Sequence, residues 1–318
     1  MMNLFIFLIL LFMVLLSVAF FTLMERKILG YCHTRKGPNK SGLIGLLQPI
    51  SDAMKLFSKE ANQMFYMNMV IYLISPILSI LLMLLIWMIF SFNSNSFYLN
   101  MGIIYFLCVS SMGGYAILWS GWSSNSKYSL IGAYRGFAQV ISYEVSMAMM
   151  MIGICMITQS YSMLSLIKIQ NNWMIILSFS FLFLLWMLIG LAETNRSPFD
   201  LAEGESELVS GFNIEYGSWL FAIIFMAEYG MIMAISLLTN YMFFGWKTWG
   251  NLILLMIMIL FVMIRGTYVR FRYDKLMMMA WKVILPQTIL MFFIVFFLVF
   301  ISNSFCINFW NYLSLKKD

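Results

Sequence analysis

Long apolar runs separated by short polar segments dominate the sequence, and eight runs are long enough to cross a bilayer. A hydrocarbon core of about 30 Å requires about 20 helical residues. The runs are continuous and lack the alternation of barrel strands, so we expect helices. The predicted fold is an all-α polytopic membrane protein with about eight transmembrane helices. They lie near residues 2–24, 68–92, 101–121, 136–158, 172–192, 217–244, 251–268 and 283–309.

The segment LIGLLQPISDAMKLFSKE follows the first run and is too polar to cross. Its apolar residues recur at about i, i+3, i+4 and i+7, whereas Gln48, Asp52, Lys55 and Lys59 take the other side. This pattern predicts an amphipathic helix lying along the membrane interface. A surface helix packed on neighbouring spans is the alternative.

Composition agrees with this pattern. The chain is 63% hydrophobic and only 10% charged, with a mean hydropathy of +0.90, which excludes a soluble globular domain. The first apolar run lacks a basic start and a small-residue cleavage site, so we interpret it as a retained span rather than a signal peptide. We treat residues 1–318 as a single integral membrane domain.

Loop charges predict the orientation. Fifteen of the nineteen basic residues fall in the segments after the first, third, fifth and seventh runs. By the positive-inside rule these segments face inward, to the cytoplasm or mitochondrial matrix, and both termini face outward. The predicted inner loops are 25–67, 122–135, 193–216 and 265–282.

Carboxylates are informative because charges are rare. The segment 193–216 has six acidic residues and one basic residue, Arg196. If residues 200–207 were helical, Asp200, Glu203 and Glu207 would share one face. Crowded carboxyl groups raise one another's pKa. Although a solvated acidic loop is the plain alternative, we favour a cluster that binds protons or cations.

Two further acids, Glu144 and Glu228, fall inside predicted spans. An ionised side chain at the bilayer centre costs about 2.5–3.5 kcal/mol on insertion scales, so both should face protein or water. A proton or ion relay is favoured over a purely structural hydrogen bond. The sequence leaves Arg135 and Arg196 equally open as basic partners.

The sequence lacks the usual motifs for binding nucleotides, haem, metals or iron–sulfur clusters. The sequence has no dinucleotide or P-loop motif, one histidine and four widely separated cysteines. We therefore expect no nicotinamide, haem, metal or iron–sulfur cluster bound by this chain, and no nucleic acid. The basic run Arg265, Arg270 and Arg272 could be topogenic, contact lipid headgroups or face an acidic partner.

Several long blocks together resemble the subunit 1 family of the proton-pumping NADH:quinone oxidoreductase, respiratory complex I. The methionine-rich composition resembles arthropod mitochondrial members. The resemblance covers essentially the whole chain and is carried by ERKILGYCHTRKGPNKSGLIGLLQPISDAMKLFSKE (25–60), GWSSNSKYSLIGAYRGFAQVISYEV (121–145), LAETNRSPFDLAEGESELVSGFNIEYG (191–217), FMAEY (225–229) and RFRYDKLM (270–277).

The resemblance implies a subunit of the mitochondrial inner membrane, with both termini in the intermembrane space, where the membrane arm meets the soluble redox arm. Ubiquinone would be the substrate. FMN, NADH and iron–sulfur clusters would belong to partner subunits, including the soluble-arm quinone-pocket and terminal iron–sulfur subunits. Other membrane-arm subunits and phospholipid would be further partners.

The resemblance also implies site residues. The quinone tunnel and its mouth would include Arg26, Arg35, Asp52, Phe225, Arg265, Arg270 and Arg272. The acidic channel that couples quinone reduction to proton translocation would comprise Glu144, Glu193, Asp200, Glu203, Glu205, Glu207, Glu215 and Glu228.

The chain departs from the family pattern at Val269, where proline is common, and at Ser218-Trp219, where a glycine-containing pair is common. Three alternatives stay open from the sequence. They are an autonomous cation/proton antiporter, which should carry an intramembrane lysine, a membrane anchor of a hydrogenase-type complex, and a structural scaffold without a chemical role.

Overall fold

The chain folds into a helical bundle, described by a computed structural model over residues 2–61, 66–90, 99–170, 174–245 and 249–314. These residues contain no strand. The main helices are α1 (Met2–Cys32), α2 (Gln48–Phe57), α3 (Met69–Trp87), α4 (Gly102–Ser123), α5 (Lys127–Thr158), α6 (Met163–Gln170), α7 (Ile175–Ser178), α8 (Ser180–Glu193), α9 (Glu205–Leu208), α10 (Ser218–Thr239), α11 (Gly250–Thr267), α12 (Tyr273–Met278) and α13 (Leu285–Ser314). Short helical turns are η1 (Leu43–Gly45), η2 (Gly211–Asn213), η3 (Asn240–Phe244) and η4 (Met279–Ile284).

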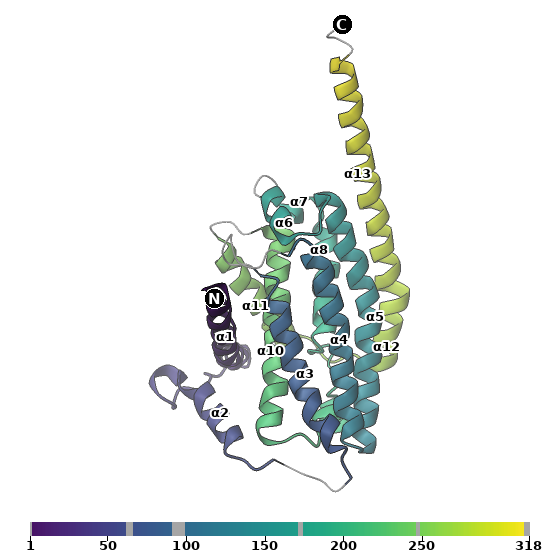
Figure 1. The fold of residues 1–318 in the computed structure, drawn as a ribbon. Coiled ribbons are helices and arrows are strands. Elements are labelled where there is room, and N and C mark those ends of the chain that lie inside the picture. The colour runs from purple at the N-terminus through teal and green to yellow at the C-terminus, as the bar shows by residue number, and fades with distance from the viewer. Residues whose placement is uncertain (1, 62–65, 91–98, 171–173, 246–248, 315–318) are drawn as a thin grey trace.

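The long helices α3, α4, α5, α10 and α13 run side by side, and α13 extends past one end of the others (Figure 1). Helix α5 is central because α4, α8 and α13 all pack on it, while α1 packs on α10 and α11. Large side chains such as Trp186, Tyr143, Phe106 and Met83 are fully buried between the helices. Outward-facing residues such as Phe297 and Phe300 remain exposed and apolar, as expected for a surface in contact with lipid tails.

Seven helices are long and apolar enough to cross a membrane among the described residues. They match seven of the eight predicted runs. The remaining run, 172–192, is interrupted: α7 ends at Ser178, Phe179 takes the non-helical angles φ −129° and ψ 53°, and α8 follows. Residues 171–173 of that run lie outside the described residues. The all-α polytopic prediction is confirmed, whereas the eighth predicted span is represented in the described residues by the shorter apolar helix α8.

Several helices extend beyond the predicted apolar runs. Helix α1 continues to Cys32, and α5 already begins at Lys127. Helices α12, η4 and α13 follow one another from Tyr273 without a break. Lysine and arginine are good helix formers, so a helix need not end where the hydrocarbon ends. The segments 122–135 and 265–282, predicted as inner loops, are therefore mostly helical.

The amphipathic helix forms as α2 and contacts both α1 and α10 at the edge of the bundle (Figure 1). It starts later than the pattern suggests because Ile44 and Gly45 have φ values of 58° and 80°, which break the helix. Its apolar side chains Ile50, Met54 and Phe57 are each more than half exposed. The apolar face is thus not covered by the rest of this chain, as an interfacial helix requires.

Candidate functional site

The acidic segment between α8 and α10 is held against α5 by one buried amide. The Gln139 side-chain nitrogen donates to the carbonyls of Ala192, at 2.9 Å, and Phe199, at 2.8 Å. These carbonyls flank the turn that carries Arg196. Gln139 is fully buried, so both bonds are shielded from water. The turn therefore has a defined position relative to α5.

Two glycines bring the same segment into backbone contact with α5. Gly211 has a φ of +56°, and a Cβ there would lie 1.8 Å from the carbonyl oxygen of Ala202. A Cβ at Gly132 of α5 would lie 2.8 Å from the Gly211 Cα. The neighbouring atoms are backbone and cannot rotate away, so this close approach requires glycine at both positions.

The stretch between α11 and α12 braces the other side of the segment. The Phe271 amide donates to the Pro198 carbonyl at 3.0 Å, and the rings of Phe199 and Phe271 stack with centroids 5.5 Å apart. Arg270 forms an ion pair with buried Asp200 at 3.3 Å. One member of the predicted basic run thus neutralises one member of the predicted acidic set.

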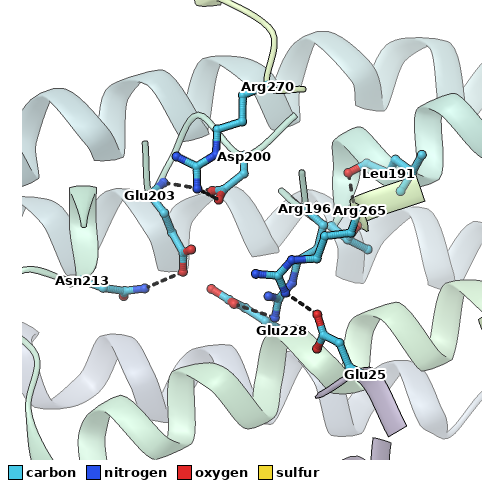
Figure 2. Close-up of polar contacts among 10 residues, drawn as sticks. Glu25, Leu191, Arg196, Asp200, Glu203, Asn213, Glu228, Arg265 and Arg270 are labelled. Carbon is cyan, nitrogen blue, oxygen red and sulfur yellow. Dashed lines mark hydrogen bonds and ion pairs between the residues drawn. The ribbon is translucent and has the colours of Figure 1, made fainter. Parts of the chain in front are cut away.

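The interior holds carboxylates interleaved with arginines (Figure 2). Arg196 pairs with Glu228 of α10 at 3.2 Å, and Arg265 of α11 pairs with Glu25 of α1. Glu203 accepts from the Asn213 amide at 3.2 Å and donates its backbone N–H to Asp200 at 3.4 Å. The sequence left Arg135 and Arg196 open as partners, and the structure assigns Arg196 to Glu228.

Glu207 is not part of this interior group of charges. Residues 201–203 form turns rather than a helix, and α9 is a single turn from Glu205 to Leu208. The conditional prediction of one helical face for Asp200, Glu203 and Glu207 is therefore wrong. Glu207 is exposed and pairs with Arg135 at 2.7 Å.

A partly open cavity of about 110 Å³ lies where α3, α4, α5 and α10 meet the acidic segment. Three predicted acids line it, namely Glu193, Glu203 and Glu228. A water needs about 10–15 Å³ of such volume and two or more polar partners. The volume thus accommodates several waters, and the carboxylates, Thr194 and three serines supply partners.

Buried polar atoms without a partner also indicate that the cavity can hold water. Glu193 Oε2 and Asn195 Oδ1 are buried and have no hydrogen-bond partner in the protein, and both residues line the cavity. An unsatisfied buried acceptor costs about 1–3 kcal/mol, so such groups normally bind water. The cavity is therefore chemically suited to hold water against carboxylates.

The environment of the two loop acids favours protonation. Burial, followed by repulsion from Asp200, raises the pKa of Glu203 above its ordinary value, although Arg196 and Arg265 oppose this. Burial also raises the pKa of Asp200, against the attraction of Arg270 and Arg196. These carboxyl groups can therefore take up or release a proton closer to neutrality than free carboxyl groups.

The other predicted acids lie around this core. Glu144 is half-buried on α5 and is not part of the cavity wall. Glu215 is half-buried, and its backbone carbonyl accepts from the Tyr72 hydroxyl at 2.9 Å. The side chain of Glu205 lies outside the described residues. The predicted acidic set is thus only partly gathered around one cavity.

Some of the predicted tunnel residues lie outside the interior ion pairs, and two of them belong to those pairs. Arg26 and Asp52 form an ion pair of 2.6 Å that joins α1 to α2, and Arg35 is exposed just beyond α1. Arg272 is exposed and pairs with Asp274 at 3.1 Å. Phe225 lies on α10 between Phe221 and Tyr229, with ring centroids 4.4 and 6.4 Å away. Arg265 and Arg270 belong instead to the interior ion pairs.

Two interior residues were missed by the sequence reasoning. Tyr229 lies under Arg196, with the guanidinium carbon 4.3 Å from the ring centroid. Glu25 is buried with Val14, Val18 and Phe21 on one face of α1. Their helical spacing places Glu25 on the inward face, so the periodicity of the first run could have identified it.

No group of three or more His, Cys, Asp or Glu side chains is placed to hold a metal ion within the described ranges. The charged side chains gathered around Arg196 are carboxylates and arginines, and Tyr229 lies among them. Such a site can bind protons, water or a polar head group, and it presents no soft ligands for a transition metal.

Comparison with known proteins shows the family to which the chain belongs. The NADH dehydrogenase family model matches residues 5–296. NADH-ubiquinone oxidoreductase chain 1 of Rhipicephalus sanguineus is 64% identical over 304 residues, covering 95% of this chain and 97% of that protein. The chain 1 proteins of Aedes aegypti and Sminthopsis macroura are 49% and 45% identical, covering 88% and 87% of this chain and 91% and 90% of theirs. The chain therefore belongs to the NADH dehydrogenase family.

Proposed function

We propose that this chain is the subunit of a mitochondrial NADH–ubiquinone oxidoreductase that forms the quinone access tunnel and the acidic channel coupling quinone reduction to proton translocation. The observation that carries the proposal is the cavity lined by Glu193, Glu203 and Glu228. The relatives' names supply the reaction, NADH to ubiquinone. The chain would act in the inner membrane with soluble-arm and other membrane-arm subunits.

The electrostatics of the cavity support a coupling role. Glu228 is tied to Arg196, and Asp200 is tied to Arg270, so a change of charge at one carboxylate alters the balance at the next. Groups that interact this strongly titrate as a set rather than singly. A proton consumed near one end of the set would therefore shift proton occupancy at the other end.

Partly exposed aromatic side chains on α10 support the proposed quinone tunnel. Phe221 and Phe225 are partly exposed on α10, two turns and one turn respectively before Tyr229, which lies against Arg196. An isoprenoid tail requires an apolar lining, and a quinone head group requires polar donors at the end of it. Helix α2, with its exposed apolar face and the Arg26–Asp52 pair, would form the rim.

The test is substitution of the cavity acids in the assembled enzyme, made at the matching positions of a bacterial relative. Glu228→Gln and Glu193→Gln remove a titratable proton while keeping the shape of the side chain. We expect NADH oxidation by ubiquinone, and the protons moved with it, to fall about 10²-fold, the scale typical for loss of a proton-transfer group. NADH oxidation by a water-soluble acceptor that bypasses quinone should be unchanged.

Glu207→Gln is the matched control, because Glu207 belongs to the same acidic segment but lies outside the cavity. It should retain most ubiquinone reductase activity. Equal losses in the control and the cavity variants, or full proton movement in Glu228→Gln, would overturn the channel assignment.

Filling the cavity provides an independent test. Gly113 of α4 lines the cavity, and a Cβ there would meet no atom within 4 Å. Gly113→Leu should therefore displace water without a backbone clash, and proton movement should fall although every acid is intact. Gly113→Ala is the control, and it should behave almost as the parent.

A native gel of the source membranes would test the partner assignment. The chain should appear by mass spectrometry only in a very large, NADH-active band. Recovery in a small band without NADH activity would instead favour an autonomous antiporter.

A further inference from the structure

A buried cluster of hydroxyl groups lies beside the cavity, between α3, α4 and the start of α10. The Tyr216 hydroxyl is 2.8 Å from Ser75 Oγ and 3.2 Å from Ser123 Oγ. All three side chains are at most 5% exposed. The Tyr216 ring stacks on Tyr72, with centroids 4.3 Å apart and an interplanar angle of 12°. The stack fixes the position of the Tyr216 hydroxyl.

The cluster opens onto the acid-lined cavity at one end. Ser75 is part of the cavity wall together with Glu193, Glu203 and Glu228. Ser120 is also in the wall, and its carbonyl accepts from Ser123 Oγ at 3.0 Å. A water in the cavity could therefore exchange a proton with the Ser75 hydroxyl, and Ser75 with Tyr216.

The other end of the cluster lies where α4 ends. Ser123 is the last residue of α4, and its carbonyl accepts from the Asn68 amide at 3.0 Å, just before α3 begins. The next residues carry more hydroxyls: Ser129 accepts from Ser124 at 2.6 Å and from Ser126 at 2.8 Å. Exposure increases here, since Asn125 is exposed. This is the end of the bundle predicted to face the matrix.

Hydroxyl groups suit proton transfer because each can donate one hydrogen bond and accept two. A proton accepted by one hydroxyl is released from its other side, and rotation of the O–H groups resets the chain. No bond other than O–H forms or breaks, nothing is oxidised or reduced, and each hydroxyl ends with the proton count it began with. Backbone carbonyls around the cluster keep the O–H groups oriented.

We propose that Ser75, Tyr216 and Ser123 form a proton-transfer path from the acid-lined cavity to Ser123 at the end of α4, where water would exchange the proton with the Ser123 hydroxyl on the side predicted to face the matrix. The path rests on the proposed function, and it adds the route by which the cavity acids are reprotonated. Tyr216 is the central member, because it alone contacts both serines through their hydroxyl groups.

The stacked pair provides a closely matched test. Tyr216→Phe and Tyr72→Phe each remove one hydroxyl from the same stack and preserve both rings. The Tyr72 hydroxyl donates to the Glu215 carbonyl and is not part of the path. In the assembled enzyme reconstituted in liposomes, we expect Tyr216→Phe to lower ubiquinone-coupled proton uptake about tenfold. The factor by which D₂O slows its ubiquinone reductase rate should also differ from the factor measured for the parent enzyme.

Tyr72→Phe should change the rate less than about twofold and leave the D₂O effect as in the parent. A purely structural role for the Tyr216 hydroxyl would weaken both variants alike and leave the isotope effect unchanged. That result would overturn the path, and so would normal proton uptake by Tyr216→Phe.

A serine pair keeps the test decisive if Tyr216→Phe fails to assemble. Ser75→Ala removes the hydroxyl that joins the cavity to Tyr216. Ser79→Ala removes a hydroxyl one turn further along the same helix, outside the cavity wall, that donates to the Pro76 carbonyl at 2.7 Å. We expect a loss of proton uptake in Ser75→Ala and near-parental uptake in Ser79→Ala. Equal behaviour of the two would overturn the path.

The outcomes separate this inference from the proposed function. If Glu228→Gln loses coupling while Tyr216→Phe and Ser75→Ala do not, the acidic channel stands and the hydroxyl path is wrong. If Glu228→Gln retains full coupling, the proposed function fails and the hydroxyl path fails with it.

Discussion

The interior around Arg196 and the rim formed by α1 and α2 both contain ion pairs, but their surroundings differ. Arg196 and Glu228 have side chains 9% and 22% exposed, whereas those of Arg26 and Asp52 are 51% and 35% exposed. A buried charge depends on its partner, since removing the partner costs about 3–5 kcal/mol. An exposed pair is typically worth about 0–1 kcal/mol. Similar pairs thus have structural importance in one region and little in the other.

The largest effect should come from disturbing the backbone that carries the interior charges. Gly211→Ala would place a Cβ 1.8 Å from the Ala202 carbonyl oxygen, and it would also strain a φ of +56°. We expect no assembled enzyme, measured as loss of the high-mass NADH-active band on a native gel. Gly113→Ala is the control, and normal assembly of Gly211→Ala would refute the close contact between Gly211 and the Ala202 carbonyl.

Arg196→Met should have the next largest effect. It leaves Glu228 without its buried counter-charge and removes the cation over Tyr229. We expect a loss of about 3–5 kcal/mol in stability unless Glu228 is protonated. The double variant with Glu228→Gln should recover much of that loss, which thermal inactivation of the purified enzyme would measure. Absence of recovery would show that the pair is not energetically coupled.

A pH-dependent effect of intermediate size should come from Glu203. Its pKa is raised in the folded protein, so the folded state binds more protons than the unfolded state. Stability from this group is then fully present below its ordinary pKa and is lost as pH rises through the raised one. We expect Glu203→Gln to lose less thermal stability than the parent over this range, by up to about 1.4 kcal/mol per pH unit.

Glu207→Gln is the control for that experiment, since Glu207 is exposed in the same segment. Its stability should vary with pH as in the parent. Parallel pH profiles for Glu203→Gln and the parent would contradict the raised pKa.

The smallest effect on stability should come from the rim. Arg26→Gln breaks an exposed pair, so stability should change by less than about 1 kcal/mol. If the rim guides quinone, the KM for ubiquinone should rise with little change in kcat. Measuring both constants against ubiquinones of different tail length would sharpen the contrast, and an unchanged KM would remove Arg26 from the tunnel.

The sequence predicted the membrane helices well because their length and apolarity are local properties. It also singled out Glu228, because a charge in an apolar run is conspicuous, and Arg196, because it is the one basic residue of the acidic segment 193–216. It could not choose between Arg135 and Arg196 as the partner, because that choice depends on how the turn at residues 194–198 folds against Gln139. The grouping of Asp200, Glu203 and Glu207 failed because local spacing assumes a helix over residues 200–207. Residues 201–203 instead form turns, and Gly204 takes a φ of 42° before α9 begins.

The contact between Gly132 and Gly211 also bears on inherited variation. Every missense change at a glycine adds at least a Cβ, so no replacement at Gly211 avoids the Ala202 backbone. Missense alleles at this codon should therefore behave alike, as failures to assemble, whatever residue they encode. At Gly113 the allelic series should instead be graded by side-chain size, because the cavity gives small residues room. Substitutions at these two glycines would thus yield two different patterns, uniform failure to assemble at Gly211 and a graded series at Gly113.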